Sequence, residues 1–206
     1  DLTRDTIGGF NSMIEKEKKL DVDAHVTTVL FNDQYKMLYN RRELKDVSKM
    51  TDKDYTPGGM TALLDAVGRT IHKMDMVAGI HRKDKGNKVL FVIITDGEEN
   101  DSKEYTYADV KKLIKDRQEN AGWEFIFLGA NIDAAAAAEN LGIDRDRAVK
   151  YKNTGSGVRA NFKAVAELSD SLAKSGRVSD RWKETVEKDE DDAADKQSAA
   201  VTSHRR

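Results

Sequence analysis

Three segments of the 206-residue chain combine glycines with oxygen-bearing side chains, the residue types from which ion-binding loops are built. They are residues 56–66 (TPGGMTALLDA), 95–100 (TDGEEN) and 128–134 (LGANIDA). Glycines let the backbone approach a ligand closely, and carboxylate, hydroxyl and amide oxygens are the ligands that Mg²⁺ prefers. These three loops are therefore candidates for binding a hard cation.

Two of these loops allow more than one interpretation. Thr61 offers a hydroxyl at the start of a predicted helix, where it could bind a ligand or act as an N-cap that stabilises the helix by about 1 kcal/mol. Asp96 follows an apolar run and could contact a metal, but an Asp-Gly pair is also typical of a polar turn. Glu98, Glu99 and Asp101 could form a solvated acidic rim.

The third loop carries Asn131 and Asp133 directly after another apolar run. A short alanine-rich segment follows Asp133, and aspartate is a favoured N-cap residue. Helix capping is therefore the favoured role for Asp133.

The elements that must position these loops alternate between strand and helix. Residues 89–94 (VLFVII) are continuously apolar, as expected of a parallel strand covered on both faces, and 124–128 (EFIFL) predict the next strand. A weak last strand is predicted at 148–151. Helical spacing predicts four helices between and after these strands, at 60–74, after Thr106, from Asp133 to Gly142, and from Val158 to Gly176. Thr106 and Asp109, three residues apart, resemble a capping box at the start of the second helix.

The N-terminal part predicts a helix that ends near Leu20, followed by a hairpin of 25–31 and 35–39 whose second strand lies at a sheet edge. The whole pattern predicts an α/β fold: a doubly wound, mostly parallel sheet with helices on both faces and one antiparallel edge strand. Beyond 178 we predict a charged, disordered tail, with one short docked helix containing Val178, Trp182 and Val186 as the alternative.

Composition removes several classes of function. A net charge of −2 gives no basic field for nucleic acid or an anionic membrane, so neither is an expected partner. The absence of cysteine removes disulfides, thiolate metal sites and cysteine nucleophiles, and fits a reducing compartment such as the cytoplasm. No apolar run approaches the roughly 20 residues that a membrane span needs.

Taken together, these loops resemble one family. The run TPGGMTALLDAVG resembles the second metal-site motif of von Willebrand factor A domains, and VLFVIITDGEEN resembles the third. The run GWEFIFLGANIDAAAAAENLGI is similar to a stretch found in small bacterial and phage members of that family. The resemblance covers roughly residues 1–176, so that 1–178 are expected to form the domain, with a Rossmann-like fold, and 179–206 the tail.

The resemblance implies a metal-ion-dependent adhesion site, at which an acidic side chain of a protein partner completes the coordination of Mg²⁺, or of Mn²⁺ or Ca²⁺. Thr61 and Asp96 would be the metal ligands. The partner-binding rim would consist of Gly58, Gly59, Glu98, Glu99, Asn131 and Asp133. The oligomeric state is not indicated by the sequence.

The chain departs from the family pattern at one point. The first motif, Asp-x-Ser-x-Ser after the first strand, is absent, and DLTRDTIGGFNSMI resembles the segment that follows it. We therefore expect an N-terminal truncation that removes a strand from the centre of the sheet, between those near Val29 and Val89. Each backbone N–H or C=O group that loses its partner in the sheet would cost about 1–3 kcal/mol. Mg²⁺ binding should be weak, because few side-chain oxygens remain to compete with the hydration shell of the ion.

Other functions are less well supported by the residues. Asp96, Glu98 and Glu99 could be imagined as a metal-dependent phosphoryl-transfer cluster, but no G-x-x-x-x-G-K-[ST], G-x-S-x-G or HExxH motif is present, so we do not expect an enzyme. Dinucleotide binding requires glycines after the apolar 89–94 run, where this chain has acids. A structural or assembly protein with a vestigial metal site remains the alternative.

Overall fold

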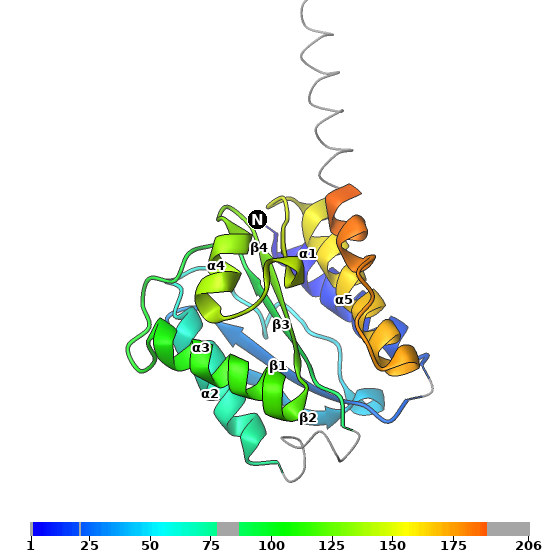
Figure 1. Ribbon diagram of the computed structural model, residues 1–206. Helices are drawn as coiled ribbons and strands as arrows, with labels where there is room; N and C mark the ends of the chain where they lie inside the picture. The colour runs from blue at the N-terminus through cyan, green and yellow to red at the C-terminus, as the bar shows by residue number, and fades with distance from the viewer. Residues whose placement is uncertain (1, 21, 78–86, 189–206) are drawn as a thin grey trace, which may run out of the picture.

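The computed structural model describes residues 2–20, 22–77 and 87–188, and its strands form two sheets (Figure 1). Strands β1 (His25–Phe31) and β2 (Tyr35–Glu43) form an antiparallel pair. Strands β3 (Leu90–Thr95), β4 (Glu124–Gly129) and β5 (Ala148–Lys150) form a parallel sheet in the order β3-β4-β5. No strand pairing joins the two sheets among the described residues.

The central strand of the parallel sheet is the most deeply buried element. Phe125, Ile126, Phe127 and Leu128 of β4 are all 1% exposed or less. Their side chains alternate between the two faces of the sheet, and both faces are covered, which explains why the run is apolar without a polar alternate.

Five longer helices cover the sheets. They are α1 (Thr3–Glu17), α2 (Leu63–Asp75), α3 (Tyr107–Asp116), α4 (Ala134–Leu141) and α5 (Gly155–Ser175). Side chains of α2, α3 and α4 form one core cluster with Phe91 and Ile93 of β3. Residues of α5 cluster with Leu90, Val92 and Ile94 on the other face. Shorter helical turns occupy Leu44–Asp46, Arg117–Ala121 and Arg145–Arg147.

Helix α1 packs directly against α5, far from it in sequence (Figure 1). Gly9 permits this close approach, because a Cβ at that position would lie 2.5 Å from the Phe162 ring. The pairing places the first turn of α1 beside the first turn of α5, where Asp5 forms an ion pair with Arg159.

Several helix ends follow the sequence prediction. Thr106 and Asp109 form a reciprocal capping box, and the Asp133 side chain accepts a hydrogen bond from the Ala136 N–H. Gly176, with φ 69°, ends α5 in the left-handed conformation. The residues that cap these helices were therefore predicted correctly from the sequence.

The predicted start of α2 needs correction, and the predicted sheet is shown only in part. Helix α2 begins at Leu63 rather than Met60, and Met60 is 50% exposed instead of lying on the buried face. The mixed α/β class with a parallel sheet is confirmed, whereas the described strands form two sheets, and the single doubly wound sheet stays a prediction.

The C-terminal segment is ordered further than we predicted. Val178, Trp182 and Val186 are 7%, 1% and 1% exposed, and they join the core cluster of α5. The short docked helix is therefore what the structure has for 182–188, and residues 189–206 lie outside the described residues. No described helix combines the length and the apolar character that crossing a membrane requires.

Candidate metal and partner-binding site

The two predicted metal ligands lie on neighbouring loops at the carboxyl end of β3. A Cβ added to Gly97 would lie 3.4 Å from the Thr61 hydroxyl oxygen, so the Thr61 side chain faces the residue directly after Asp96. The Thr95 side chain donates to the Gly97 carbonyl at 3.0 Å and shapes this turn. The structure thus brings the first two predicted loops together.

Asn100 fastens these two loops to each other. Its side-chain oxygen accepts a hydrogen bond from the Thr61 N–H at 2.8 Å, and its own N–H donates to the Thr61 carbonyl at 3.0 Å. Because both backbone groups of Thr61 are bonded to Asn100, the backbone of Thr61 is held against the 96–100 loop.

Glu99 has an internal role that the sequence did not reveal. Its carboxylate accepts hydrogen bonds from the N–H of Leu64 at 2.9 Å and from the N–H and hydroxyl of Ser102 at 2.8 and 2.7 Å. Glu99 therefore caps α2 from a distant loop. The residue at the N-cap position is Ala62, and the N-cap interpretation of Thr61 is wrong.

Asp65 is a second buried carboxylate, and sequence reasoning missed it. It is 6% exposed and accepts hydrogen bonds from the N–H groups of Lys103, Glu104 and Tyr105 at 2.9–3.0 Å. Burial alone raises the pKa of Asp65, but these donors and Arg69 outweigh it and lower the pKa below 3.8. The signal available in the sequence was an aspartate inside the apolar run LLDAV.

Asp96 differs from both of these acids. It is exposed, and its carboxylate makes no hydrogen bond or ion pair with another residue in the part of the chain that the structure describes. Two tyrosines lie close enough to sense its charge: burial first, and then Asp96, raise the pKa of Tyr55 and of Tyr151. Tyr55 is also hydrogen bonded to Thr6, so the start of α1 reaches the same site.

The third predicted loop adjoins the other two. The Asn131 side-chain amide donates to the Asp96 carbonyl at 3.2 Å, and Asn131 has a left-handed φ of 58°. Glu98, Asn131, Asp133 and Lys150 line a hollow of about 470 Å³ beside it. Three predicted rim residues therefore share one surface, although Asp133 also caps α4.

Gly58 and Gly59 shape the loop that precedes Thr61. Their φ angles of 119° and 92° lie in the region that side chains rarely adopt. Asn32 anchors the turn, because its side-chain amide donates to the Gly58 carbonyl at 2.8 Å. A Cβ on Gly59 would come within 2.5 Å of the Asp33 carboxylate, which is the end of an exposed side chain, so the positive φ rather than lack of space favours glycine here.

These residues would satisfy only part of a Mg²⁺ coordination shell. Thr61 and Asp96 offer one hydroxyl and one carboxylate, and Mg²⁺ requires six oxygens in an octahedron. Within 2–20, 22–77 and 87–188, no group of three or more His, Cys, Asp or Glu residues is arranged to hold a metal. Water and groups from elsewhere would have to supply the remaining ligands.

The chain matches no protein-family model, and a search of curated proteins found no significant relative.

Proposed function

We propose that the carboxyl edge of β3 is a Mg²⁺-assisted protein-docking site. In this proposal Thr61 and Asp96 hold the ion, and an acidic side chain of a partner protein completes its coordination. The protein is then a binding module rather than an enzyme, and the two sheets belong to a doubly wound domain of the von Willebrand factor A type. The sequence resemblance supports this, and Mn²⁺ or Ca²⁺ could replace Mg²⁺.

The observation that carries the proposal is the contrast among the acids of these loops. Asp65 and Glu99 accept hydrogen bonds from backbone N–H groups, whereas Asp96 is exposed and its carboxylate has no hydrogen-bond partner among the described residues. A carboxylate and a hydroxyl on neighbouring loops supply the oxygen ligands that Mg²⁺ prefers. The proposed rim consists of Gly58, Gly59, Glu98, Asn131 and Asp133.

The affinity for the metal alone should be low. Two protein oxygens compete poorly with the hydration shell of Mg²⁺, which the ion gives up reluctantly. We expect binding in the millimolar range, and a partner carboxylate should strengthen it. The second candidate, an assembly protein with a vestigial metal site, is favoured by the same small number of ligands among the described residues.

Paramagnetic broadening by Mn²⁺ separates the two candidates residue by residue. In a ¹⁵N-labelled chain, we expect substoichiometric Mn²⁺ to broaden the amide signals of Thr61, Asp96 and Gly97 first. Asp96→Ala should abolish this selectivity, whereas Asp133→Ala, which removes an acid nearby, should retain it. Broadening that ignores Asp96 would support the vestigial site.

Partner engagement is tested with a short peptide that contains one glutamate. If the proposal holds, the glutamate methylene protons broaden only when both Mn²⁺ and the chain are present. The same peptide with glutamine provides the control. Equal broadening of the two peptides would mean that no carboxylate completes the coordination.

A further inference from the structure

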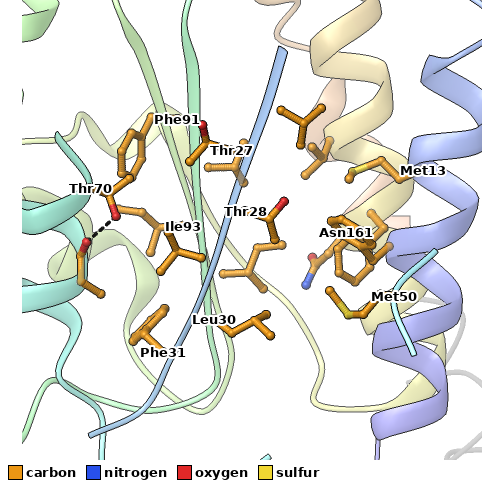
Figure 2. Close-up of a pocket in the computed structure, with 18 of the residues that line it drawn as sticks. Met13, Thr27, Thr28, Leu30, Phe31, Met50, Thr70, Phe91, Ile93 and Asn161 are labelled. Atoms are coloured by element: carbon orange, nitrogen blue, oxygen red, sulfur yellow. Dashed lines mark hydrogen bonds between the residues drawn. The ribbon is translucent and has the colours of Figure 1, made fainter. Parts of the chain in front are cut away.

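Most large apolar side chains of this protein are turned away from the surface. Those of β1 and β3 line a cavity of about 1560 Å³ between the two sheets, and Figure 2 shows Leu30, Phe91 and Ile93 among the lining residues. The large apolar or aromatic residues that are exposed in the described part of the chain are Val22, Met60, Met76 and Tyr107. Single exposed residues of this kind are common, so their meaning depends on what they adjoin.

Met60 brings an apolar side chain to the candidate docking site. It directly precedes Thr61, whose N–H and carbonyl are both bonded to Asn100. Its side chain is 50% exposed, although the residues from Ala62 onward into α2 are buried. Methionine is enriched at protein interfaces, and its flexible thioether adapts to the shape of a partner. A partner that docks over Thr61 is therefore expected to cover Met60 as well.

Tyr107 is the second exposed residue of this kind at the site. It is 44% exposed at the start of α3, where Thr106 and Asp109 form the capping box. Burial first, and then the charges of Glu99 and Glu98, raise the pKa of Tyr107, so its ring lies within reach of both carboxylates. The start of α3 thus presents an aromatic ring beside the loop that follows β3.

The segment that leads from this loop to α3 is held in place by carboxylates. Each backbone N–H from residue 101 to residue 106 donates to a carboxylate at 2.8–3.0 Å, and the acceptors are Glu99, Asp65 and Asp109 in turn. A segment whose donors are all satisfied in this way has little freedom to move. The position of Tyr107 relative to the loop is therefore set by the backbone that precedes it.

The exposed charge at this surface is mostly negative. Asp96, Glu98 and Asp133 are exposed, and none of the three forms an ion pair within the described residues. Glu98 and Asp133 line the hollow of about 470 Å³ together with one base, Lys150. A bound Mg²⁺ would offset the charge of Asp96, but an acidic partner would still approach two further carboxylates. An acidic side chain is therefore favoured here when a cation accompanies it.

Arginine is the cation that fits Glu98 and Tyr107 together. Its planar guanidinium donates to a carboxylate through two N–H groups and can stack on an aromatic ring, whereas lysine offers only a point charge. The chain already contains one such arrangement. The Arg69 guanidinium lies 5.8 Å from the centre of the Tyr35 ring and donates to the two carboxylate oxygens of Glu104 at 2.8 and 2.6 Å.

We infer that the docking segment of the partner carries an arginine close to its acidic residue, that Glu98 and Tyr107 bind the guanidinium of this arginine, and that Met60 contacts an apolar side chain of the same segment. This inference rests on the proposed function, because it specifies the partner of the same site. The partner is then recognised by three chemical features, an acid at the metal, an arginine beside it and an apolar contact, rather than by the acid alone.

Titration of the ¹⁵N-labelled chain with short peptides in the presence of Mg²⁺ tests the arginine. One peptide carries a glutamate with an arginine two positions away on each side, because such side chains point the same way in an extended peptide. The control peptide has citrulline in place of arginine, which keeps the shape and removes the charge. From the amide shifts of Glu98 and Tyr107, we expect the arginine peptide to bind about three- to tenfold more tightly. Equal affinities would overturn the inference.

Variants of the chain show whether the preference arises at the proposed residues. Glu98→Gln and Tyr107→Leu should each remove most of the preference for arginine over citrulline. Asp133→Asn, at an acid that lines the same hollow, and Tyr107→Phe, which keeps the ring, should retain it. A preference that survives both Glu98→Gln and Tyr107→Leu would mean that arginine is attracted by the general negative charge, and the inference would be wrong.

The apolar contact is tested with a third peptide, in which a leucine stands next to the glutamate. We expect this leucine to strengthen binding at least about twofold, and Met60→Ser to remove the gain. The same gain in the parent and in Met60→Ser would place the apolar contact elsewhere.

Repeating the titrations without metal distinguishes this inference from the proposed function. If arginine is preferred equally with Mg²⁺ and with EDTA, the arginine subsite stands and metal-assisted docking is wrong. If Mg²⁺ strengthens the arginine and citrulline peptides by the same factor and neither is preferred, metal-assisted docking stands and the arginine subsite is wrong. If no peptide binds under either condition, both are wrong.

Discussion

The Glu99 carboxylate accepts a hydrogen bond from the backbone N–H of Leu64 at 2.9 Å, although 35 positions separate the two residues. Helix α2 has no side-chain N-cap of its own, so a loop from the end of β3 supplies the acceptor. The negative charge also lies at the positive end of the helix dipole. The loop that carries Asp96 is therefore attached directly to the start of the helix that follows Thr61.

Replacing Glu99 should weaken the attachment of this loop to α2 and lower the stability of the protein. We expect Glu99→Ala to destabilise the protein by about 1–3 kcal/mol, because the Leu64 N–H and the Ser102 groups lose their acceptor. Urea denaturation measures the change. Glu98→Ala is the matched control, since Glu98 is exposed on the same loop, and should have almost no effect. Similar losses in both variants would contradict a capping role for Glu99.

Asp65 should make stability depend on pH in the acid range. Its folded-state pKa lies below its unfolded value near 3.8, so its contribution is fully present above that value. The contribution is lost as pH falls through the lower folded pKa. We expect the protein to lose stability below about pH 4 partly for this reason, and Asp65→Asn to weaken that dependence.

The contribution of the Asp65 carboxylate to the free energy of unfolding can be measured at neutral pH. Asp65→Ala leaves three N–H groups of residues 103–105 without their acceptor and should cost about 3 kcal/mol. Asp101→Ala, at a less buried acid on the neighbouring loop, is the comparison. An Asp65→Ala protein as stable as the unsubstituted chain would show that the 103–105 turn does not need this carboxylate.

Much of the fold could be predicted from the sequence, because the patterns that specify it involve residues close together in the chain. The apolar run of β4, the Thr106 capping box and the glycine that ends α5 each depend on residues close in sequence. The site was harder to predict, because its geometry depends on contacts across 35–40 positions. Whether Glu99 faces a partner or a helix end cannot be decided from TDGEEN alone.

The C-terminal segment illustrates the same limit. Val178, Trp182 and Val186 recur every four residues, but the surrounding sequence is charged, and composition favoured disorder. Three large side chains nevertheless bury against α5 and outweigh the polar surroundings. Tertiary packing, rather than propensity, decided the structure of this segment.

Trp182 should therefore contribute to the stability of the domain. The side chain is 1% exposed, and truncation to alanine should cost about 3–5 kcal/mol through lost contacts and the resulting cavity. Thermal unfolding followed by circular dichroism measures this loss. Arg181→Ala, on the neighbouring exposed position, should change the midpoint little. If Trp182→Ala unfolds at the same temperature as the parent, the segment does not belong to the folded domain.

Glu17 should give the opposite pH dependence from Asp65. Burial is the main cause that raises the pKa of Glu17 from 4.5 to about 7, and a hydrogen bond from Ser169 and the charge of Lys16 offset it only partly. Because the folded-state pKa is the higher one, the stabilising contribution is fully present below pH 4.5. It is lost as pH rises through about 7.

Glu17→Gln should remove this dependence. The glutamine variant should be more stable than the parent at pH 8 by about 2 kcal/mol, a value reduced because Glu17 is only partly buried, and nearly equal to it at pH 4. Chemical denaturation at both pH values provides the measurement. Glu15→Gln, at an exposed acid on the same helix, controls for the loss of charge.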